Sequence, residues 1–271
     1  MSIVFHNSDF IKEDDLVIES SNRALNYGDG FFETIKIINT KPFNFSAHYL
    51  RYCFACSVLK LDCTENEESL LLHLNKLIKH NNIVNGSAKI YISRGGEGKY
   101  LPDSTSSDII IRTNDGLGFE LNTAISLFVF SDEVKTIGKI SNIKSVNALV
   151  SVLGAIHAKE NGFDNAILMN NEGNFIETTN SNIFLVKNEV VYTPPITDGC
   201  VDGAMRKWVV QNINVVERSI DITDIRDANE VFITNAVTGV TGVNRVEKTF
   251  FLNSDYSSKL QKKLINLSLG L

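Results

Sequence analysis

Apolar residues in the first half of the chain fall into short β-rich runs and two longer stretches with helical spacing. The β-rich runs predict strands within 2–18, which turns at Asn7-Ser8-Asp9, within 31–45, which turns at Asn39-Thr40, and over 87–93 and 108–112. One helix is predicted over 47–61, with Ser46 as its N-cap. The other lies within 65–83, where Leu70, Leu74 and Leu77 form an apolar stripe.

The second half is predicted to be richer in strands. They are expected at 124–130, 164–169, 174–178, 182–186, 190–193 and 230–234. A helix is predicted from Lys144 to about Gly162, and a second helix near Ala204. The buried side of the first of these helices is expected to carry Val146, Leu149, Val150, Leu153, Ile156 and Ala158.

The polar, glycine-bearing stretch after 108–112 is the best candidate for a domain linker. We therefore expect an N-terminal domain over 1–113, a linker over 114–122 and a C-terminal domain over 123–271. A chain of 271 residues is long enough for two domains of ordinary size.

Composition indicates a globular protein with a substantial core, because 43% of the residues are hydrophobic and 21% are charged. A net charge of −6 gives no electrostatic reason to expect nucleic acid or an acidic membrane as a partner. The first residues lack the basic and apolar pattern of a signal peptide, and no apolar run reaches the roughly 18 residues of a membrane span. A cytoplasmic location is the default expectation.

Cys53 and Cys56 form a C-x-x-C pair, which is typical of a redox site or half of a zinc site. Both fall on the apolar face of the predicted helix over 47–61, and no second pair or paired histidines would complete a metal site. We interpret them as core residues and predict no metal site.

Lys144 and Glu177 are the strongest candidates for chemistry. A lysine amine can hold a cofactor aldehyde as a Schiff base. A carboxylate can keep a pyridine nitrogen protonated, so that the ring serves as an electron sink. Taken alone, either residue is more often a solvated surface charge.

Three further features suit an anion, although each is common by itself. Ala204 and Met205 follow Gly203 at a predicted helix N-terminus, where backbone N–H groups and the helix dipole favour negative charge. The loop from Asn235 through Ala236 to Thr238 offers an amide, N–H groups and a hydroxyl. Arg51 could bind a phosphate, yet an arginine on a helix is more often a surface charge.

The glycine-rich segment 94–100 can be interpreted as a mobile active-site loop or as a plain turn. It lacks the phosphate-binding G-x-x-x-x-G-K-[ST] pattern and no helix is predicted after it. The pattern alone slightly favours a plain turn.

The order of these residues, with YGDGFFET at the front and FDNAILMNNEGNFIETTNSNIFLVKNEVVYTP in the second half, resembles the fold-type IV pyridoxal-phosphate enzymes. That family contains branched-chain aminotransferases, D-amino-acid aminotransferases and aminodeoxychorismate lyases. The resemblance extends from about Ser21 to Val243. It implies an α+β fold like that of D-amino-acid aminotransferase, with a smaller N-terminal α/β domain and a barrel-like C-terminal domain with helices. It also implies pyridoxal 5'-phosphate as cofactor, a small-molecule substrate and a homodimer.

The resemblance implies roles for individual residues. Lys144 would carry the cofactor and act as the catalytic base, and Glu177 would bind the pyridine nitrogen. The phosphate would be bound by Arg51, Ala204 and Met205, with Asn235, Ala236 and Thr238 completing its site. Thr34 would offer a hydroxyl to the substrate. Arg94, Lys99 and Tyr100 are candidate substrate ligands, because their loop should face the site.

Local residues favour a lyase that converts 4-amino-4-deoxychorismate into 4-aminobenzoate and pyruvate. Asn147 and Leu149 match the lyase and D-amino-acid form of the lysine motif, and Met205 matches the lyase form of the phosphate turn. Phe32 stands where D-amino-acid enzymes have tyrosine, and Gly98-Lys99-Tyr100 replaces their R-x-H carboxylate trap. The alternative is an aminotransferase for branched-chain or D-amino acids. A non-catalytic relative would usually have lost Lys144 or Glu177, and both are present.

Overall fold

The computed structural model describes residues 2–271, which divide into two compact units. The first unit comprises the described residues up to Gly118 together with Ile143–Asn147, and the second comprises Phe119–Asn142 and Ala148–Leu271. The change of unit at Gly118 falls within the stretch 114–122 that the sequence suggested as a linker. The assignment of Ile143–Asn147 to the first unit was not predicted, and it places Lys144 in that unit.

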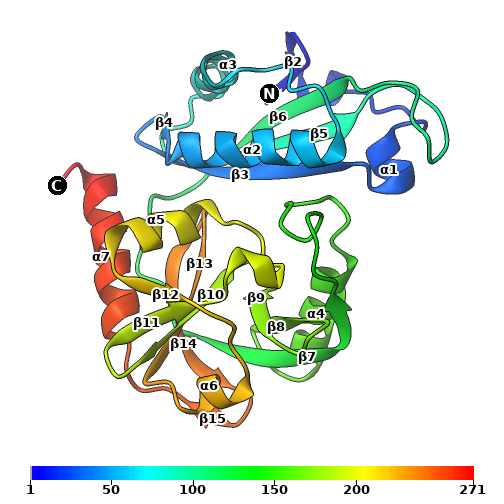
Figure 1. The fold of residues 1–271 in the computed structure, drawn as a ribbon. Helices are drawn as coiled ribbons and strands as arrows, with labels where there is room; N and C mark the ends of the chain where they lie inside the picture. Colours follow the sequence, from blue (N-terminus) through cyan, green and yellow to red (C-terminus); the bar gives the residue numbers. More distant parts are fainter. Residues whose placement is uncertain (1) are drawn as a thin grey trace. The chain divides into compact units, whose positions relative to one another are not determined.

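The first unit is built on a six-stranded sheet with strand order β2-β1-β6-β5-β3-β4 (Figure 1). Its strands are β1 (Ile3–His6), β2 (Asp9–Lys12), β3 (Gly30–Ile38), β4 (Lys41–Pro42), β5 (Gly86–Arg94) and β6 (Ser107–Asp115). Its helical segments are a 3-10 turn (Glu13–Asp15), α1 (Arg23–Tyr27), α2 (Phe45–Leu59) and α3 (Glu67–His80).

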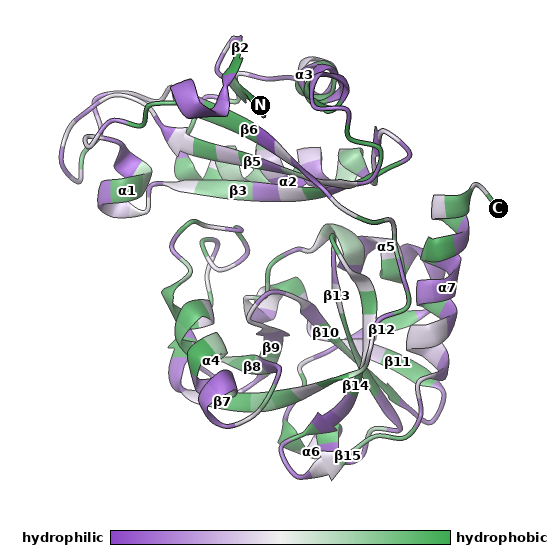
Figure 2. Cartoon of the chain, turned by 180° about the vertical axis from the view of Figure 1, so that it is seen from behind, coloured by the Kyte–Doolittle hydropathy of each residue, from purple (hydrophilic) through white to green (hydrophobic). Residues whose placement is uncertain are grey.

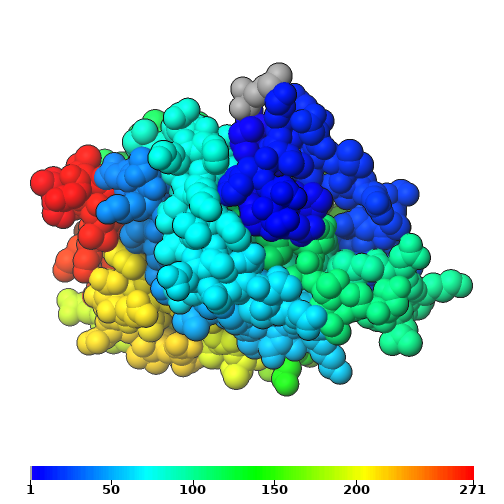
Figure 3. Space-filling view, turned by 90° about the horizontal axis from the view of Figure 1, so that it is seen from above, coloured from blue at the N-terminus to red at the C-terminus, as the bar shows by residue number. Residues whose placement is uncertain are grey.

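Alternation along β3 separates a core face from a polar face. Phe31 and Ile35 are fully buried and pack with Tyr52 of α2 and Leu74 of α3, so these helices cover one face of the sheet. Figure 1 shows α2 running alongside β3, and in Figure 3 the cyan atoms of α3 lie beside the dark blue N-terminal strands. The opposite face carries the alternate residues of β3, Phe32 and Thr34.

The second unit contains a nine-stranded sheet in which β12-β11-β10-β13-β14-β7-β8-β9 are neighbours and β15 pairs with β14. Its strands are β7 (Ile125–Lys135), β8 (Asn165–Asn170), β9 (Phe175–Thr178), β10 (Asn182–Lys187), β11 (Val190–Thr193), β12 (Val215–Glu217), β13 (Glu230–Asn235), β14 (Gly239–Val246) and β15 (Thr249–Phe250). Its helical segments are α4 (Leu149–Glu160), a 3-10 turn (Ile196–Asp198), α5 (Ala204–Asn212), α6 (Ile222–Arg226) and α7 (Asp255–Leu269).

This second sheet closes on itself because β9 pairs with both β8 and β10. The closing pair is Glu177 with Asn182, and Glu177 also pairs with Leu168 of β8. Closure removes the free edges of these strands, and buried residues such as Ile183 and Val231 fill the interior. A small sheet unit and a barrel-like unit give the α+β architecture that the sequence led us to expect.

The predicted helix from Lys144 is wrong at its start and in its buried side. Helix α4 begins at Leu149, because the backbone of 144–146 pairs with β3 instead. Leu149, Leu153 and Ile156 are 69%, 40% and 47% exposed, whereas Gly154 and Ala158 are buried. Helical spacing identified an apolar face correctly, but it could not show whether the fold covers that face.

Ser46 is not the N-cap of α2. The helix begins at Phe45, its N-cap is Asn44 with φ +53°, and the Ser46 hydroxyl instead donates to a carboxylate oxygen of Glu67 at 2.5 Å. Helix α3 does have a side-chain cap, since Asn66 accepts the backbone N–H of Ser69. Helix α7, strands β14 and β15, and the short elements α1, β12 and α6 were not predicted.

Cys56 is buried and Cys53 is half-buried on α2, and the Cys53 sulfur lies 3.7 Å from that of Cys63. Across residues 2–271, no cluster of three or more histidine, cysteine or acidic side chains is arranged to hold a metal. The same residues include no helix that is long and apolar enough to cross a membrane.

Candidate active site

Lys144 lies on a short extended segment that continues the sheet of the first unit along β3. The N–H of Phe32 donates to the carbonyl of Lys144 at 3.0 Å, and the N–H of Val146 donates to the carbonyl of Gly30 at 3.2 Å. These two bonds flank an antiparallel bridge between Phe31 and Ser145. The lysine Nζ lies 4.7 Å from the centroid of the Phe32 ring. The sheet therefore fixes the backbone of Lys144, and an aromatic face lies against its amine.

Two glycines make room for this arrangement. A Cβ on Gly30 would lie 2.5 Å from the carbonyl oxygen of Ile92, so β3 and β5 could not keep their spacing. Gly28 has φ +66°, and a Cβ there would lie 3.2 Å from the Cβ of Asn147. The two glycines of the YGDG motif thus allow the backbone there to lie close to β5 and to the Lys144 segment.

Arg51 lies on the core side of β3, in a buried ion pair with Glu33. Its Nε and Nη2 donate to the two carboxylate oxygens of Glu33 at 2.7 and 2.6 Å. His48 Nδ1 lies 2.6 Å from Glu33 Oε2, and all three side chains are at most 6% exposed. A bidentate pair of this kind holds the plane of the guanidinium.

Burial and charge oppose each other in this group. Burial raises the pKa of Glu33, but Arg51 and the His48 hydrogen bond outweigh it and lower the pKa to about 2. Burial lowers the pKa of His48 below its usual range, although Glu33 acts in the other direction. Glu33 is therefore an anion and His48 neutral at neutral pH.

Arg94 does not project freely from the glycine-rich loop. Its Nε donates to Asp29 at 2.9 Å, and its terminal nitrogens donate to the carbonyls of Leu59 and Lys60 at 2.5 and 3.1 Å. Arg23 binds the same Asp29 at 3.0 Å. Asp29 thus joins two buried arginines, and the guanidinium of Arg94 is already bound by acceptors of its own unit.

Arg23 also anchors the loop after β5. Its Nη1 donates to the carbonyls of Gly98 and Lys99 at 2.9 and 2.8 Å. Tyr100 at the tip is 92% exposed, and Lys99 is exposed too. The loop thus has a fixed base, and both predicted ligands at its tip are exposed.

Glu177 lies in the second unit at the strand pair that closes the sheet. Its Oε2 accepts the N–H of Val201 at 2.9 Å, and its Oε1 accepts from Nζ of Lys135. The Lys135 ammonium also donates to the carbonyl of Ser141 at 3.1 Å. Glu177 is 6% exposed, so this carboxylate is held by donors rather than by water.

Asn182 links Glu177 to the N-terminus of α5. Its Nδ2 donates to the carbonyl of Val201 at 2.8 Å. A Cβ on Gly203 would lie 1.9 Å from its Oδ1, so only glycine fits before the helix. Gly203 makes no side-chain cap, and the backbone N–H groups of Ala204 and Met205 lie at the positive end of the helix dipole, which favours an anion.

The loop after β13 forms a tight turn around the Asn235 side chain. Its Oδ1 accepts the N–H groups of Val237 and Thr238, both at 2.9 Å. Its Nδ2 donates to the hydroxyl of Ser181 at 3.0 Å. The Asn235 amide therefore shapes the turn that carries Ala236, and it ties that turn to the segment that follows Glu177.

The predicted residues divide between the two units. Lys144, Thr34 and Arg51 belong to the first, with Arg51 on the core side of β3 and Thr34 on its opposite face, and Glu177, the start of α5 and the 235–238 turn belong to the second. The sequence patterns did not identify four charged residues that contact the predicted residues or lie beside them: Glu33, Asp29, Lys135 and Lys89. Lys89 had a signal in the alternation of Ser87, Lys89, Tyr91 and Ser93 with apolar residues, which places the four on one face of β5.

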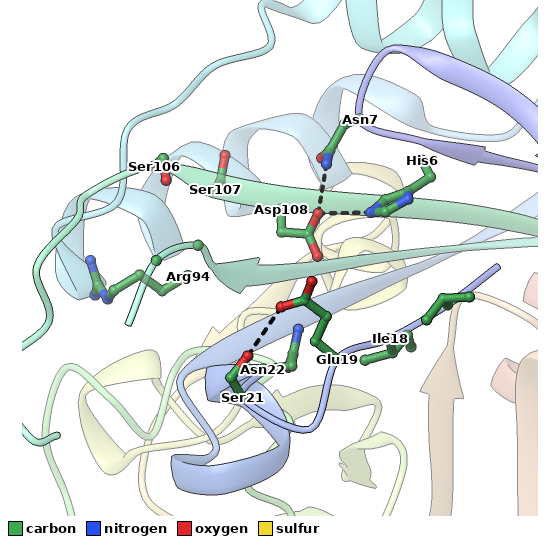
Figure 4. A pocket seen from close by; sticks show the side chains of 13 residues that line it. His6, Asn7, Ile18, Glu19, Ser21, Asn22, Arg94, Ser106, Ser107 and Asp108 are labelled. Atoms are coloured by element: carbon green, nitrogen blue, oxygen red, sulfur yellow. Dashed lines mark hydrogen bonds and ion pairs between the residues drawn. The ribbon is translucent and has the colours of Figure 1, made fainter. Parts of the chain in front are cut away.

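A pocket of about 340 Å³ lies within the first unit at the end of β5 and the start of β6 (Figure 4). Asp108 accepts from Asn7 at 2.8 Å and lies 3.0 Å from His6 Nε2, while Glu19 accepts from Ser21. Figure 4 shows the Glu19 and Asp108 side chains extending toward each other. Neither Lys144 nor Thr34 lines this pocket.

The model of the class IV aminotransferase family matches residues 30–246, and the chain belongs to this family. Among known sequences, it is similar to the "Putative branched-chain-amino-acid aminotransferase" of Methanocaldococcus jannaschii, with 28% identity over 96% of this chain and 93% of that protein. It is also similar to the D-alanine aminotransferase of Staphylococcus epidermidis, with 25% identity over 91% of this chain and 90% of that protein.

Solved structures share the fold over nearly the whole chain. The branched-chain aminotransferase of Thermoproteus uzoniensis, crystallised with norvaline, superposes with a TM-score of 0.91 at 21% identity, covering 99% of this chain and 95% of that one. A "Putative 4-amino-4-deoxychorismate lyase" from Legionella pneumophila gives a TM-score of 0.85 at 26% identity, covering 94% and 97%. The protein is thus a class IV enzyme with the fold-type IV architecture, of aminotransferase or lyase type.

Its cofactor is pyridoxal 5'-phosphate, on which enzymes of this family depend. The donor set of the chain fits that molecule. Lys144 supplies a primary amine, Glu177 supplies a buried carboxylate for a ring nitrogen, and α5 begins with a glycine that leaves a helix end for a phosphate.

Proposed function

We propose that this enzyme releases pyruvate from 4-amino-4-deoxychorismate and leaves 4-aminobenzoate. The reaction needs no second substrate, since the atoms of the two products add up to those of the reactant. The single observation behind this choice over an aminotransferase is the engagement of Arg94 by Asp29 and by the carbonyls of Leu59 and Lys60. An aminotransferase must hold the α-carboxylate of two successive substrates, and charge-assisted donors normally do this.

In this proposal the cofactor, when bound, supplies an aldehyde for the substrate amine and a ring that accepts negative charge. The Lys144 amine removes the proton from the ring carbon that bears the substrate amine. The bond from the carbocycle to the enolpyruvyl oxygen then breaks, and the departing three-carbon unit takes up a proton to become pyruvate. We assign the hydroxyl of Thr34, on the polar face of β3, to contact with the departing three-carbon unit.

We assign the cofactor contacts as the resemblance implied. Glu177 keeps a proton on the ring nitrogen, with Lys135 and the Val201 N–H holding its carboxylate in place. The N–H groups of Ala204 and Met205, the 235–238 turn and Arg51 bind the phosphate. Glu33 orients the Arg51 guanidinium for this contact.

A second candidate is an aminotransferase for branched-chain or D-amino acids. The names of the relatives from Methanocaldococcus jannaschii and Staphylococcus epidermidis favour it. Local residues point the other way, because Phe32 and Met205 have the lyase form, while Asn147, which packs against Gly28, has a form shared by lyases and D-amino-acid enzymes.

We further propose that the enzyme is a homodimer. Leu149, Val152, Leu153 and Ile156 form an exposed apolar row on α4, which is largely green in Figure 2. Such a row on one helix face is covered when two copies pack together. Sedimentation of the wild type and of Leu153→Asp should show a dimer and a monomer respectively. A monomeric wild type would contradict the proposal.

The reaction is tested by supplying 4-amino-4-deoxychorismate and measuring 4-aminobenzoate and pyruvate together. Equal amounts of both products, absent with Lys144→Ala, are expected. In parallel, the holoenzyme is mixed with L- and D-amino acids, and conversion of the cofactor to its amine form is followed by absorbance. Complete conversion with an ordinary amino acid, and no 4-aminobenzoate, would establish the aminotransferase instead.

A further inference from the structure

We propose that Cys53 and Cys63 are a modification site, at which a reversible disulfide forms when the protein meets an oxidised low-molecular-weight thiol such as glutathione disulfide. The cross-link joins α2 to the connection 60–66 that leads to α3. It is independent of the reaction proposed above. The C-x-x-C pattern suggested Cys56 as the redox partner of Cys53, whereas the structure gives Cys53 a different neighbour.

The two sulfurs are already in contact. Sγ of Cys53 lies 3.7 Å from Sγ of Cys63, and both residues are free thiols. A disulfide bond is about 2.05 Å long, so the sulfurs need to approach by roughly 1.7 Å, which rotation of the two side chains can supply. Cys63 is exposed and Cys53 is half-buried, so a small oxidant reaches the pair from solvent.

The backbone on both sides of Cys63 is held against α2. The chain turns back on the helix after its last residue, and the N–H of Leu61 donates to the carbonyl of Cys56 at 2.9 Å. Further along, the Tyr49 hydroxyl on α2 donates to the carbonyl of Glu65 at 3.2 Å. These hydrogen bonds are present in the reduced protein. The cross-link therefore forms within the native arrangement and does not require the connection to unfold.

The other two cysteines are poor partners. Cys56 and Cys200 are at most 2% exposed, and burial raises the pKa of each thiol to about 12. The thiolate is the form that reacts, so we expect both to remain thiols. Partial burial raises the pKa of Cys63 as well, but its side chain is open to solvent, so the fraction present as thiolate can meet an oxidant.

The exchange has two steps and needs no further reactant. The thiolate of Cys63 attacks one sulfur of glutathione disulfide, which forms a mixed disulfide and releases one glutathione as its thiolate. The thiolate of Cys53 then attacks the sulfur of Cys63 and releases the second glutathione. The protons lost by the two cysteines go to the two glutathione thiolates. The cysteine pair is thus oxidised by two electrons, and glutathione disulfide is reduced by two electrons.

The inference is tested by incubating the holoenzyme with glutathione disulfide at about pH 8.5, near the ordinary pKa of cysteine. Remaining thiols are then blocked with N-ethylmaleimide in urea, and the protein is digested without reduction. Trypsin separates peptide 52–60, which holds Cys53 and Cys56, from peptide 61–76, which holds Cys63. We expect mass spectrometry to find these peptides joined, with the maleimide on Cys56, and dithiothreitol to release them.

A non-reducing gel distinguishes a bond within one chain from a bond between two copies, and we expect a single chain. Cys200→Ala is the matched control, because it removes a cysteine from the other unit and should form the same cross-link as wild type. A mixed disulfide alone, a bond through Cys56, a bond between two copies or loss of the cross-link in Cys200→Ala overturns the inference.

Urea unfolding provides the second measurement. A cross-link that fits the native structure restricts mainly the unfolded chain, so oxidised wild type should unfold at a higher urea concentration than reduced wild type. Cys63→Ser, which cannot form the bond, should gain no stability from the same treatment. An equal or lower midpoint for the oxidised wild type overturns the inference that the native arrangement accommodates this disulfide.

Discussion

The backbone N–H of Phe32 donates to the carbonyl of Lys144 at 3.0 Å, and the ring of the same phenylalanine lies 4.7 Å from the lysine Nζ. One residue of β3 therefore fixes the backbone of the lysine and contacts its amine. The sheet of the first unit, and not the helix that follows in sequence, determines where the reactive amine is placed.

Borohydride treatment of the holoenzyme should make the link between the cofactor and Lys144 permanent. We expect a yellow protein with one labelled peptide containing Lys144. Lys144→Ala should abolish the label, whereas Lys139→Ala, an exposed lysine nearby, should retain it. Mass spectrometry of the digested protein identifies the site, and a label on any other lysine would refute the assignment.

Glu177→Gln should slow turnover while the cofactor stays bound. The amide keeps the size of the side chain but removes the negative charge that would hold a proton on the ring nitrogen, and the phosphate contacts are unaffected. We expect at least a tenfold fall in kcat, or about 1.4 kcal/mol of transition-state stabilisation. Stopped-flow kinetics and cofactor absorbance measure the two quantities. Glu172→Gln, on the exposed turn before β9, should behave as wild type, and unchanged turnover in Glu177→Gln would mean that another group binds the ring.

Acid should destabilise the protein through the buried group of Glu33, Arg51 and His48. The pKa of Glu33 is lowered to about 2, so its contribution to stability is present above its unfolded pKa near 4.5 and is lost as pH falls toward 2. The pKa of His48 is also lowered, so the unfolded chain binds a proton first and stability begins to fall below about pH 6.5.

Urea unfolding at a series of pH values measures this dependence. At pH 7, Glu33→Gln should lose about 3–5 kcal/mol, because it leaves the Arg51 charge buried without its anion. The steep loss of stability below pH 4.5 should be much smaller in this variant, and the loss that begins near pH 6.5 should be smaller in His48→Gln. Equal pH dependence in all three proteins would contradict the assignment.

Gly30→Ala should weaken both the fold and the cofactor link. A Cβ at this position would lie 2.5 Å from the carbonyl oxygen of Ile92, so β3 must shift from β5 and carry the Lys144 segment with it. We expect a loss of about 1–3 kcal/mol, measured by chemical denaturation, together with less borohydride label on Lys144. Gly138→Ala is the matched control, since a Cβ there meets no atom within 4 Å. Equal stability and equal labelling of the two variants would show that a Cβ at position 30 does not disturb the spacing of β3 and β5.

Features that depend on neighbouring residues in the chain could be predicted from the sequence alone. The alternation over 87–93 predicted β5, and the spacing of Leu70, Leu74 and Leu77 predicted α3, since both patterns reflect local geometry. The motifs around Lys144 and Glu177 indicated the family, because the chemistry of a cofactor requires those side chains in that order.

Tertiary structure alone decided which groups meet. Lys135 pairs with Glu177 across 42 positions, and Asp29 binds Arg94 across 65. Sequence spacing has no information about such distant pairs, because each depends on how strands from separate segments are aligned. Closure of the second sheet has the same origin, because β10 pairs with the distant strand β13 as well as with its sequence neighbour β9.

The start of α4 shows the difference most directly. Local spacing predicted a helix from Lys144, and helical backbone does begin five residues later, at Leu149. Between them, the backbone groups of Lys144 and Val146 bond to β3 residues more than a hundred positions earlier in the chain. A backbone N–H or carbonyl that bonds to a strand cannot also serve a helix, so the tertiary pairing ended the helix before it reached the lysine.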